Sequence, residues 1–180
     1  MKVTLAAALC ATFAATAYAA PDSSNSAQES QAPQLVMAAN ITLPDAIRTV
    51  ERKAGGHAIS ATYDVEHGNE GRYEIMVLTD DGQRVEKLDQ NAYDGLVDAE
   101  WSAPAAEVYP TVSSRSLAQM PMSLESAIAT ALDKSGGRVT DATLENRHGS
   151  DRYAVTVARN DGSVETLEVG PNGSVERVAG

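Results

Sequence analysis

Cysteine is nearly absent from this chain, and its single copy, Cys10, lies inside an apolar run near the N-terminus. Basic residues are also few, with 14 Lys and Arg against 25 Asp and Glu, and aromatic residues make up only 4% of the sequence. After that run no apolar stretch approaches the roughly 20 residues that span a bilayer. These shortages exclude a disulfide framework or a cysteine metal site. They also argue against a nucleic-acid partner and against membrane insertion.

Residues 1–19 have the features of a cleavable secretory signal. Lys2 supplies a positive start, an apolar run follows from Val3 to Ala15, and Ala17-Tyr18-Ala19 presents the small-x-small pattern that signal peptidase needs. Cleavage after this pattern removes Cys10 and leaves 13 basic and 25 acidic residues, a net charge of −12. We therefore expect a periplasmic or secreted protein that is soluble after the signal is removed.

Two segments carry the same ordered pattern at an offset of 81 residues. Ile-Thr-Leu-Pro-Asp-Ala-Ile at 41–47 matches Met-Ser-Leu-Glu-Ser-Ala-Ile at 122–128. Further pairs keep the same order, with one single-residue gap: Lys53-Ala-Gly-Gly and Lys134-Ser-Gly-Gly, His67-Gly68 and His148-Gly149, Arg72-Tyr73 and Arg152-Tyr153, Asp81-Gly82 and Asp161-Gly162. So many matches in one order predict an internal repeat.

Each copy predicts a helix followed by strands. Thr42 and Ser123 are N-cap residue types, and apolar residues follow them at the spacing of one helical face. Gly55-Gly56 and Gly136-Gly137 are typical of a helix end. Runs of alternating apolar and polar residues then predict strands joined by Gly-containing turns. We expect an α+β fold of two repeated α-β-β-β modules, each a helix packed on a small antiparallel sheet.

The domain organisation follows from these modules and the segments between them. The N-terminal segment is rich in Ser, Gln, Asn and Ala, which favours disorder. The segment between the modules contains Trp101 and other apolar residues, so part of it should pack on a module. The predicted order is a signal at 1–19, a disordered segment at 20–40, a first module at 41–97, a partly packed linker at 98–121 and a second module at 122–178.

This order of elements resembles the PepSY module, with a Leu-x-x-Ala-Ile helix, a Gly stop, a Tyr-centred strand, an Asp-Gly turn and a closing Gly turn. The resemblance covers residues 41–97 and 122–178. PepSY modules occur in propeptides of thermolysin-like metallopeptidases and in bacterial envelope proteins, so the resemblance implies modulation of a peptidase or a more general binding role. A tandem pair is also similar to secreted β-lactamase inhibitor proteins. Those proteins rely on disulfides and an aromatic-rich concave sheet, whereas this chain has six aromatics and no cysteine after signal cleavage.

No residue pattern predicts an enzyme, a cofactor or a metal site. His67 and His148 are turn residues on separate modules, and His57 aligns with an arginine, so they form no ligand set. The turns Asp80-Asp81-Gly82 and Asn160-Asp161-Gly162 lack the ligand spacing of a calcium loop and fit hairpin turns instead. No nucleophile elbow or phosphate-binding loop is present. We expect a non-enzymatic protein without a cofactor.

Four residues form a candidate partner-binding surface. The odd-numbered residues of 73–77 are predicted to face the helix, so Glu74, Met76 and Leu78 should point to the other side of the sheet. Exposed apolar residues there indicate an interaction surface, for which Met is well suited. The alternative is that the second module or the linker, through Trp101, covers Met76 and Leu78.

The sequence therefore favours an exported protein-binding module that modulates or inhibits a peptidase or another envelope or secreted protein. A second hypothesis is a small-ligand or metal-ion binding sensor accessory of the cell envelope. Neither the oligomeric state nor the relative orientation of the two modules follows from the sequence.

Overall fold

The computed structural model describes residues 32–65, 71–108, 121–147 and 150–178. Within these residues, eight antiparallel strands form one sheet in the order β4-β3-β2-β1-β5-β6-β7-β8. The strands of the first half are β1 (Gly56–Val65), β2 (Gly71–Thr79), β3 (Arg84–Asn91) and β4 (Val97–Pro104). Those of the second half are β5 (Arg138–Arg147), β6 (Ser150–Ala158), β7 (Val164–Val169) and β8 (Val175–Arg177).

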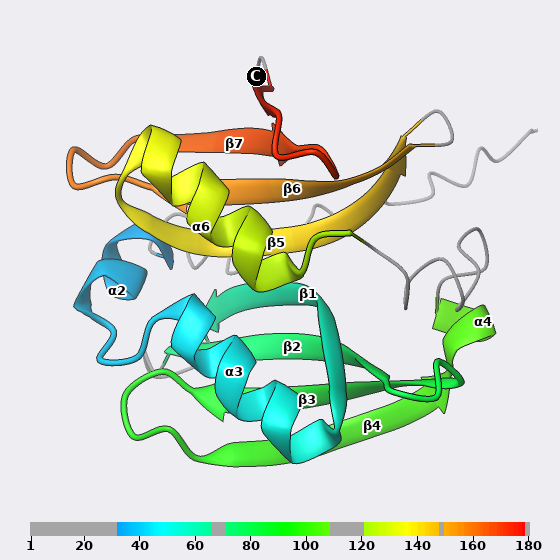
Figure 1. Cartoon of the computed structure of the whole chain (residues 1–180). Coiled ribbons are helices and arrows are strands. Elements are labelled where there is room, and N and C mark those ends of the chain that lie inside the picture. Colours follow the sequence, from blue (N-terminus) through cyan, green and yellow to red (C-terminus); the bar gives the residue numbers. More distant parts are fainter. Residues whose placement is uncertain (1–31, 66–70, 109–120, 148–149, 179–180) are drawn as a thin grey trace, which may run out of the picture.

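The predicted fold class, two modules with a small sheet each, is wrong. β1 pairs with β5 through Ser60 and Thr143, Ala61 and Ala142, and Thr62 and Asp141, so the two halves share one sheet (Figure 1). A strand edge carries backbone donors and acceptors that need partners. Side-chain periodicity shows that a strand forms, but it does not show which other strand its edge will meet.

Two helices, α3 (Leu43–Ala54) and α6 (Leu124–Ser135), lie side by side on one face of the sheet (Figure 1). The Thr42 hydroxyl accepts a hydrogen bond from the main-chain N–H of Asp45 at 3.4 Å, and Ser123 caps α6 in the same way. Each helix buries its apolar stripe against the sheet: Leu43, Ala46, Ile47 and Val50 in α3, and Leu124, Ala127, Ile128 and Ala131 in α6.

The paired glycines after each helix have two different tasks. Gly55 has a φ of 69° and donates its N–H to the carbonyl of Glu51 at 2.9 Å, which closes the last turn of α3. Gly56 begins β1 where the backbone of β2 is so close that a Cβ atom would lie 2.1 Å from the Leu78 carbonyl oxygen. The second glycine therefore allows the helix to turn directly into the sheet.

A third helix, α2 (Ala32–Ala38), lies within the segment 20–40 that was predicted to be disordered. Val36 is only 1% exposed and packs in the core. The Arg138 guanidinium donates to the carbonyls of Val36 and Ala39, at 3.3 and 2.9 Å. A residue of the second half thus holds the end of this helix, which packs over the β1–β5 junction. Residues 20–31 lie outside the described residues.

The predicted linker at 98–121 begins as part of the sheet. β4 spans most of its first residues, and α4 (Ala105–Val108) continues from the end of that strand (Figure 1). Ala105 is buried, which ties this segment to the first half. The remainder of the predicted linker, up to residue 120, lies outside the described residues, as does the predicted signal.

Candidate functional site

The sheet has one face against which α2, α3 and α6 pack and a second face with none of these helices, which we call the open face (Figure 1). Paired residues in neighbouring antiparallel strands point to the same side, so the register defines rows across the open face. One row is Trp101, Lys87, Met76, Ser60, Thr143, Ala154, Glu168 and Glu176. The next is Asp98, Asp89, Glu74, Thr62, Asp141, Thr156 and Thr166.

The four residues predicted for the partner surface do not share one environment. Glu74, Met76 and Trp101 lie in the rows of the open face, where Trp101 is 38% exposed and Met76 is partly buried. Leu78 is 2% exposed and therefore contributes packing and no contact surface. Lys87 stands between Trp101 and Met76 in their row, so the tryptophan is separated from the methionine by one strand.

Arg72 organises the charges at one end of the open face. Its guanidinium lies 3.7 Å from Asp64, 3.2 Å from Glu74 and 3.1 Å from Asp89. Burial raises the pKa of the Asp89 carboxyl, and the charge of Arg72 partly opposes that rise. The Arg72 guanidinium thus forms ion pairs with three carboxylates.

Lys87 holds the adjacent part of the same network. Its ammonium group lies 2.9 Å from Glu74 and 2.7 Å from Glu100. Burial acts to lower the pKa of Lys87, but the hydrogen bonds to the two carboxylates and their negative charges together outweigh burial and raise it. Glu74, one of the predicted site residues, is therefore shared between two cations.

Acidic side chains outnumber basic ones on this face. Among the side chains that the structure describes, the face carries three bases, Arg72, Lys87 and Arg152, and nine acids: Asp64, Glu74, Asp89, Asp98, Glu100, Asp141, Glu145, Glu168 and Glu176. Acids stand directly opposite each other at three places across neighbouring strands. Asp89 lies opposite both Glu74 and Asp98, and Glu168 lies opposite Glu176. Directly opposed like charges destabilise a sheet.

Hydroxyl groups occupy the middle of the open face, where the two halves meet. Thr62 donates a hydrogen bond of 2.7 Å to the Asp141 carboxylate, and the hydroxyls of Ser60 and Thr143 lie 3.1 Å apart. Burial raises the pKa of Asp141, and the hydrogen bond from Thr62 opposes this shift. The polar side chains at the centre of the open face thus hydrogen-bond to one another.

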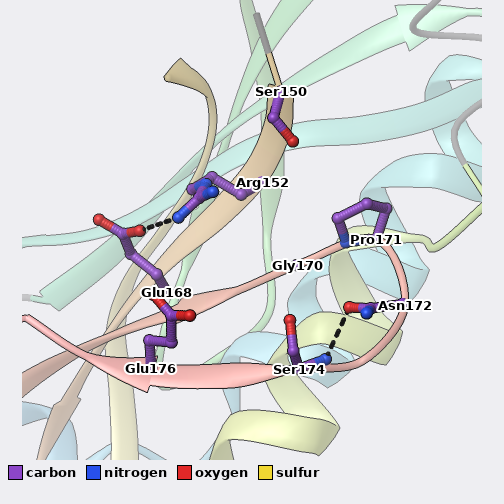
Figure 2. A pocket seen from close by; sticks show the side chains of 8 residues that line it. All are labelled: Ser150, Arg152, Glu168, Gly170, Pro171, Asn172, Ser174 and Glu176. Carbon is purple, nitrogen blue, oxygen red and sulfur yellow. Dashed lines mark hydrogen bonds and ion pairs between the residues drawn. The ribbon is translucent and has the colours of Figure 1, made fainter. Parts of the chain in front are cut away.

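A cavity of about 310 Å³ opens at the end of the face formed by β6, β7 and β8. Figure 2 shows Arg152 directed toward Glu168, with which it forms an ion pair, and Glu176 on the neighbouring strand. The turn that follows β7 closes one side, where the Asn172 side chain accepts a hydrogen bond from the main-chain N–H of Ser174 at 3.0 Å. The lining residues are Ser150, Arg152, Glu168, Gly170, Pro171, Asn172, Ser174 and Glu176.

Sequence reasoning missed this cavity and most of the charge network. The repeated Arg-Tyr pair at Arg72 and Arg152 was visible, but the acids that pair with these arginines come from other strands. Only the strand register brings Asp89 to Arg72 and Glu168 to Arg152. The available signal was the alternation of charged residues with apolar ones along each strand.

The predicted turn residues that the structure describes act as turn residues. The Asp81 carboxylate accepts a hydrogen bond from the N–H of Gln83 at 3.0 Å, and Asp161 does the same for Ser163 at 2.9 Å. His57 is exposed, 4.0 Å from Asp80, while His67 and His148 lie outside the described residues. Within the described part of the chain, no three His, Cys, Asp or Glu side chains are grouped to hold a metal ion.

No helix in the described part of the chain is both long and apolar enough to cross a membrane. No family model and no curated protein matches the sequence. Among solved structures, the chain is similar to a crystal structure described as a "putative lipoprotein" from Clostridium difficile 630, with 15% identity and a TM-score of 0.44. That match covers 78% of this chain and 95% of the other. A likeness at this level supports no conclusion about fold or function.

Proposed function

We propose that the protein is exported and binds another protein through the open face of its sheet, and that the partner presents a basic surface. The two opposed acid pairs nearest the edges of the sheet carry this proposal. Asp89 with Asp98, and Glu168 with Glu176, occupy corresponding places near the two edges of the sheet. Each such pair of like charges costs a few tenths to about 1 kcal/mol in a sheet. Arg72 and Arg152 already form ion pairs with Asp89 and Glu168, so the cations of a partner would act chiefly on Asp98 and Glu176.

A basic partner also fits the overall charge. After signal cleavage the chain carries a net charge of −12, so a basic partner would be attracted over a distance and would associate faster at low ionic strength. Trp101 supplies an aromatic side chain beside these charges, and tryptophan and arginine are frequent energetic centres of protein interfaces. Complex formation should therefore weaken as salt increases.

The resemblance to the PepSY module favours a peptidase of the envelope as this partner, with modulation of its activity as the outcome. The test starts from any peptidase that the immobilised protein captures from an envelope extract. The purified protein is added to that peptidase, and hydrolysis of an unstructured protein substrate is followed. A dose-dependent change in rate supports this assignment. An unchanged rate at saturating complex formation leaves a binding protein that does not act on peptidases.

The binding proposal itself is tested with charge reversals. Asp98→Lys and Glu176→Lys change exposed acids of the open face at its two edges, and Asp133→Lys changes an exposed acid of α6. The wild type and each variant are immobilised, and proteins that they retain from an envelope extract are identified by mass spectrometry. The affinity of each purified partner is then measured by titration calorimetry.

We expect the retained partners to be basic and each open-face reversal to weaken binding about tenfold, the loss of roughly 1.4 kcal/mol. The Asp133→Lys control should bind like the wild type. Trp101→Ala should weaken binding while unfolding within a few degrees of the wild type, because more than a third of this residue is exposed and it lies on the edge strand β4. Equal binding by the wild type and all four variants would exclude the open face as the interface.

The cavity at β6–β8 favours one alternative, a small-ligand or metal-ion binding accessory. Its lining is polar and includes both Glu168 and Glu176. A thermal-shift screen with divalent cations, repeated by calorimetry, distinguishes the two functions. An increase of several degrees in Tm with one cation, lost in Glu176→Gln, supports the alternative. No shift with any cation removes the metal-ion version.

A further inference from the structure

β4 is an open edge of the sheet. In the part of the chain that the structure describes, β4 pairs only with β3, and it extends over the eight residues from Val97 to Pro104. The opposite edge, β8, has three residues. A long edge strand presents a row of backbone donors and acceptors to any extended chain that approaches it. The β4 edge is thus the longer template of the two.

Exposed apolar residues gather at this same edge. Among the described residues, the large hydrophobic side chains that remain exposed are Leu96, Trp101 and Val164. Two of the three flank or belong to β4: Leu96, at 69% exposure, directly precedes it, and Trp101, at 38%, lies within it. Apolar side chains beside an unpaired strand are the usual specificity elements when a peptide adds to a sheet.

The side chains of β4 also define what such a peptide should carry. Asp98 heads a row of three acids on successive strands, followed by Asp89 and Glu74. Glu100 is the extra residue of a β-bulge, so Asp98 and Trp101 both lie on the open face although they are three positions apart. A chain next to β4 would therefore meet Asp98 and Trp101 on the same face, while Glu100 between them forms an ion pair with Lys87.

We propose that β4 receives an extended segment of the basic partner as a ninth strand of the sheet. The segment carries Lys or Arg opposite Asp98 and, two residues away, an apolar residue opposite Trp101. This inference rests on the proposed function, because it names the part of the partner that reaches the open face. Its cation would extend the row of three acids with an opposite charge, which favours cross-strand pairing.

A second copy of the chain does not fit this edge. Two β4 strands placed side by side would bring the Asp98 and Glu100 carboxylates of both copies together without a cation of β4 to separate them. Like charges on adjacent strands oppose pairing, and natural proteins use such charges to prevent self-association of edges. The same charges attract a basic segment.

The test uses the full chain and two synthetic heptapeptides. The first is acetyl-Thr-Lys-Thr-Leu-Thr-Lys-Thr-amide, which places Lys, Leu and Lys on one face of an extended strand. The second has the same sequence and charge but is N-methylated at every amide that joins two of its residues, so none of these amides can donate a hydrogen bond to β4. Binding is followed by amide chemical shifts and by hydrogen exchange of the labelled protein, with the Asp98→Lys and Asp133→Lys variants as a matched pair.

We expect the first peptide to shift the amides of Val97–Ala103 and to protect those that point away from β3. The N-methylated peptide should bind at least tenfold more weakly. Asp98→Lys should weaken binding of the first peptide, and Asp133→Lys should not. Equal binding of the two peptides, perturbation that leaves β4 unchanged, or a β4-mediated dimer at high protein concentration would overturn the proposal. If the peptides fail while Glu176→Lys still weakens the natural partner, the edge is excluded and the open face stands. If neither responds, both proposals fail.

Discussion

The glycine pair after α3 provides a sharp test of how the helix is joined to the sheet. Gly55 and Gly56 are adjacent, and both are small, but the structure requires each for a different reason. Gly55 has a left-handed backbone, and a Cβ atom added to it would meet nothing within 4 Å. A Cβ on Gly56 would lie 2.1 Å from the Leu78 carbonyl oxygen, deep inside van der Waals contact.

The two alanine substitutions should therefore differ in size. In Gly55→Ala the only cost is the left-handed conformation of an L-residue, about 1 kcal/mol. In Gly56→Ala the start of β1 must move away from β2, which combines overpacking of about 2 kcal/mol with a weakened hydrogen bond of about 1 kcal/mol. The expected loss at Gly56 is roughly 3 kcal/mol. For a chain of this size these losses correspond to decreases in Tm of about 2–4 °C and about 6–12 °C.

The second half offers an internal repetition of the experiment. Gly136 has open space around its Cβ direction, whereas a Cβ on Gly137 would lie 2.3 Å from the Ala158 carbonyl oxygen. Gly137 also has a φ of 91°, so Gly137→Ala should be at least as damaging as Gly56→Ala. Thermal and urea unfolding of the four variants, followed by circular dichroism, measure the losses. If Gly56→Ala is no worse than Gly55→Ala, the close approach of helix end and sheet does not determine this position.

Three further predictions concern the helix anchors, the centre of the open face and the union of the halves. The hydroxyls of Tyr73 and Tyr153 donate hydrogen bonds of 2.6 and 2.8 Å to the main-chain carbonyls of Ile41 and Met122, just before the helix caps. Changing each tyrosine to Phe should therefore lower the free energy of unfolding by about 1 kcal/mol. Losses near zero in both variants would mean that these bonds do not anchor the helices. Burial raises the folded-state pKa of Asp141 above its usual 3.8. The contribution of this group to stability is therefore greatest below pH 4 and is lost as the pH rises through the raised pKa. The stability of Asp141→Asn relative to the wild type should thus increase from pH 4 to pH 7, and a pH-independent difference in urea unfolding would contradict this cause. Fragments 32–108 and 121–180 keep every described helix and strand of their half intact. Expressed separately, each should unfold at a lower temperature than the whole chain because both lose the β1–β5 pairing. Fragments as stable as the parent would show that the junction contributes nothing.

Local structure was predictable from the sequence where neighbours along the chain determine it. Thr42 and Ser123 cap their helices as their side chains allow, and Gly55 ends α3 because a left-handed residue there closes the turn. The alternation of apolar and polar residues placed Tyr73 on the helix side and Glu74 on the other. In each case the interaction lies within a few residues, so the pattern in the sequence contains it.

Contacts between distant residues were not predictable in this way. Leu78 alternates like an exposed residue, yet packing around its end of β2 buries it, which removes it from the predicted surface. Val36 lies in a segment of disordered composition, but the Arg138 guanidinium and the core hold its helix in place. Burial of these residues depends on which elements come to lie over them, and that depends on the whole fold.

The sequence alone determined the repeated pattern, the helix and strand types, the excess of acid and the features of an export signal, because each depends on composition or on short spacings. Only the tertiary structure decided that β1 meets β5, which converts two expected sheets into one with a single open face. Backbone pairing between strands some 80 residues apart uses groups that every residue carries, so no side-chain pattern specifies it. The opposed acid pairs and the open β4 edge, on which both functional proposals depend, exist only as consequences of that pairing.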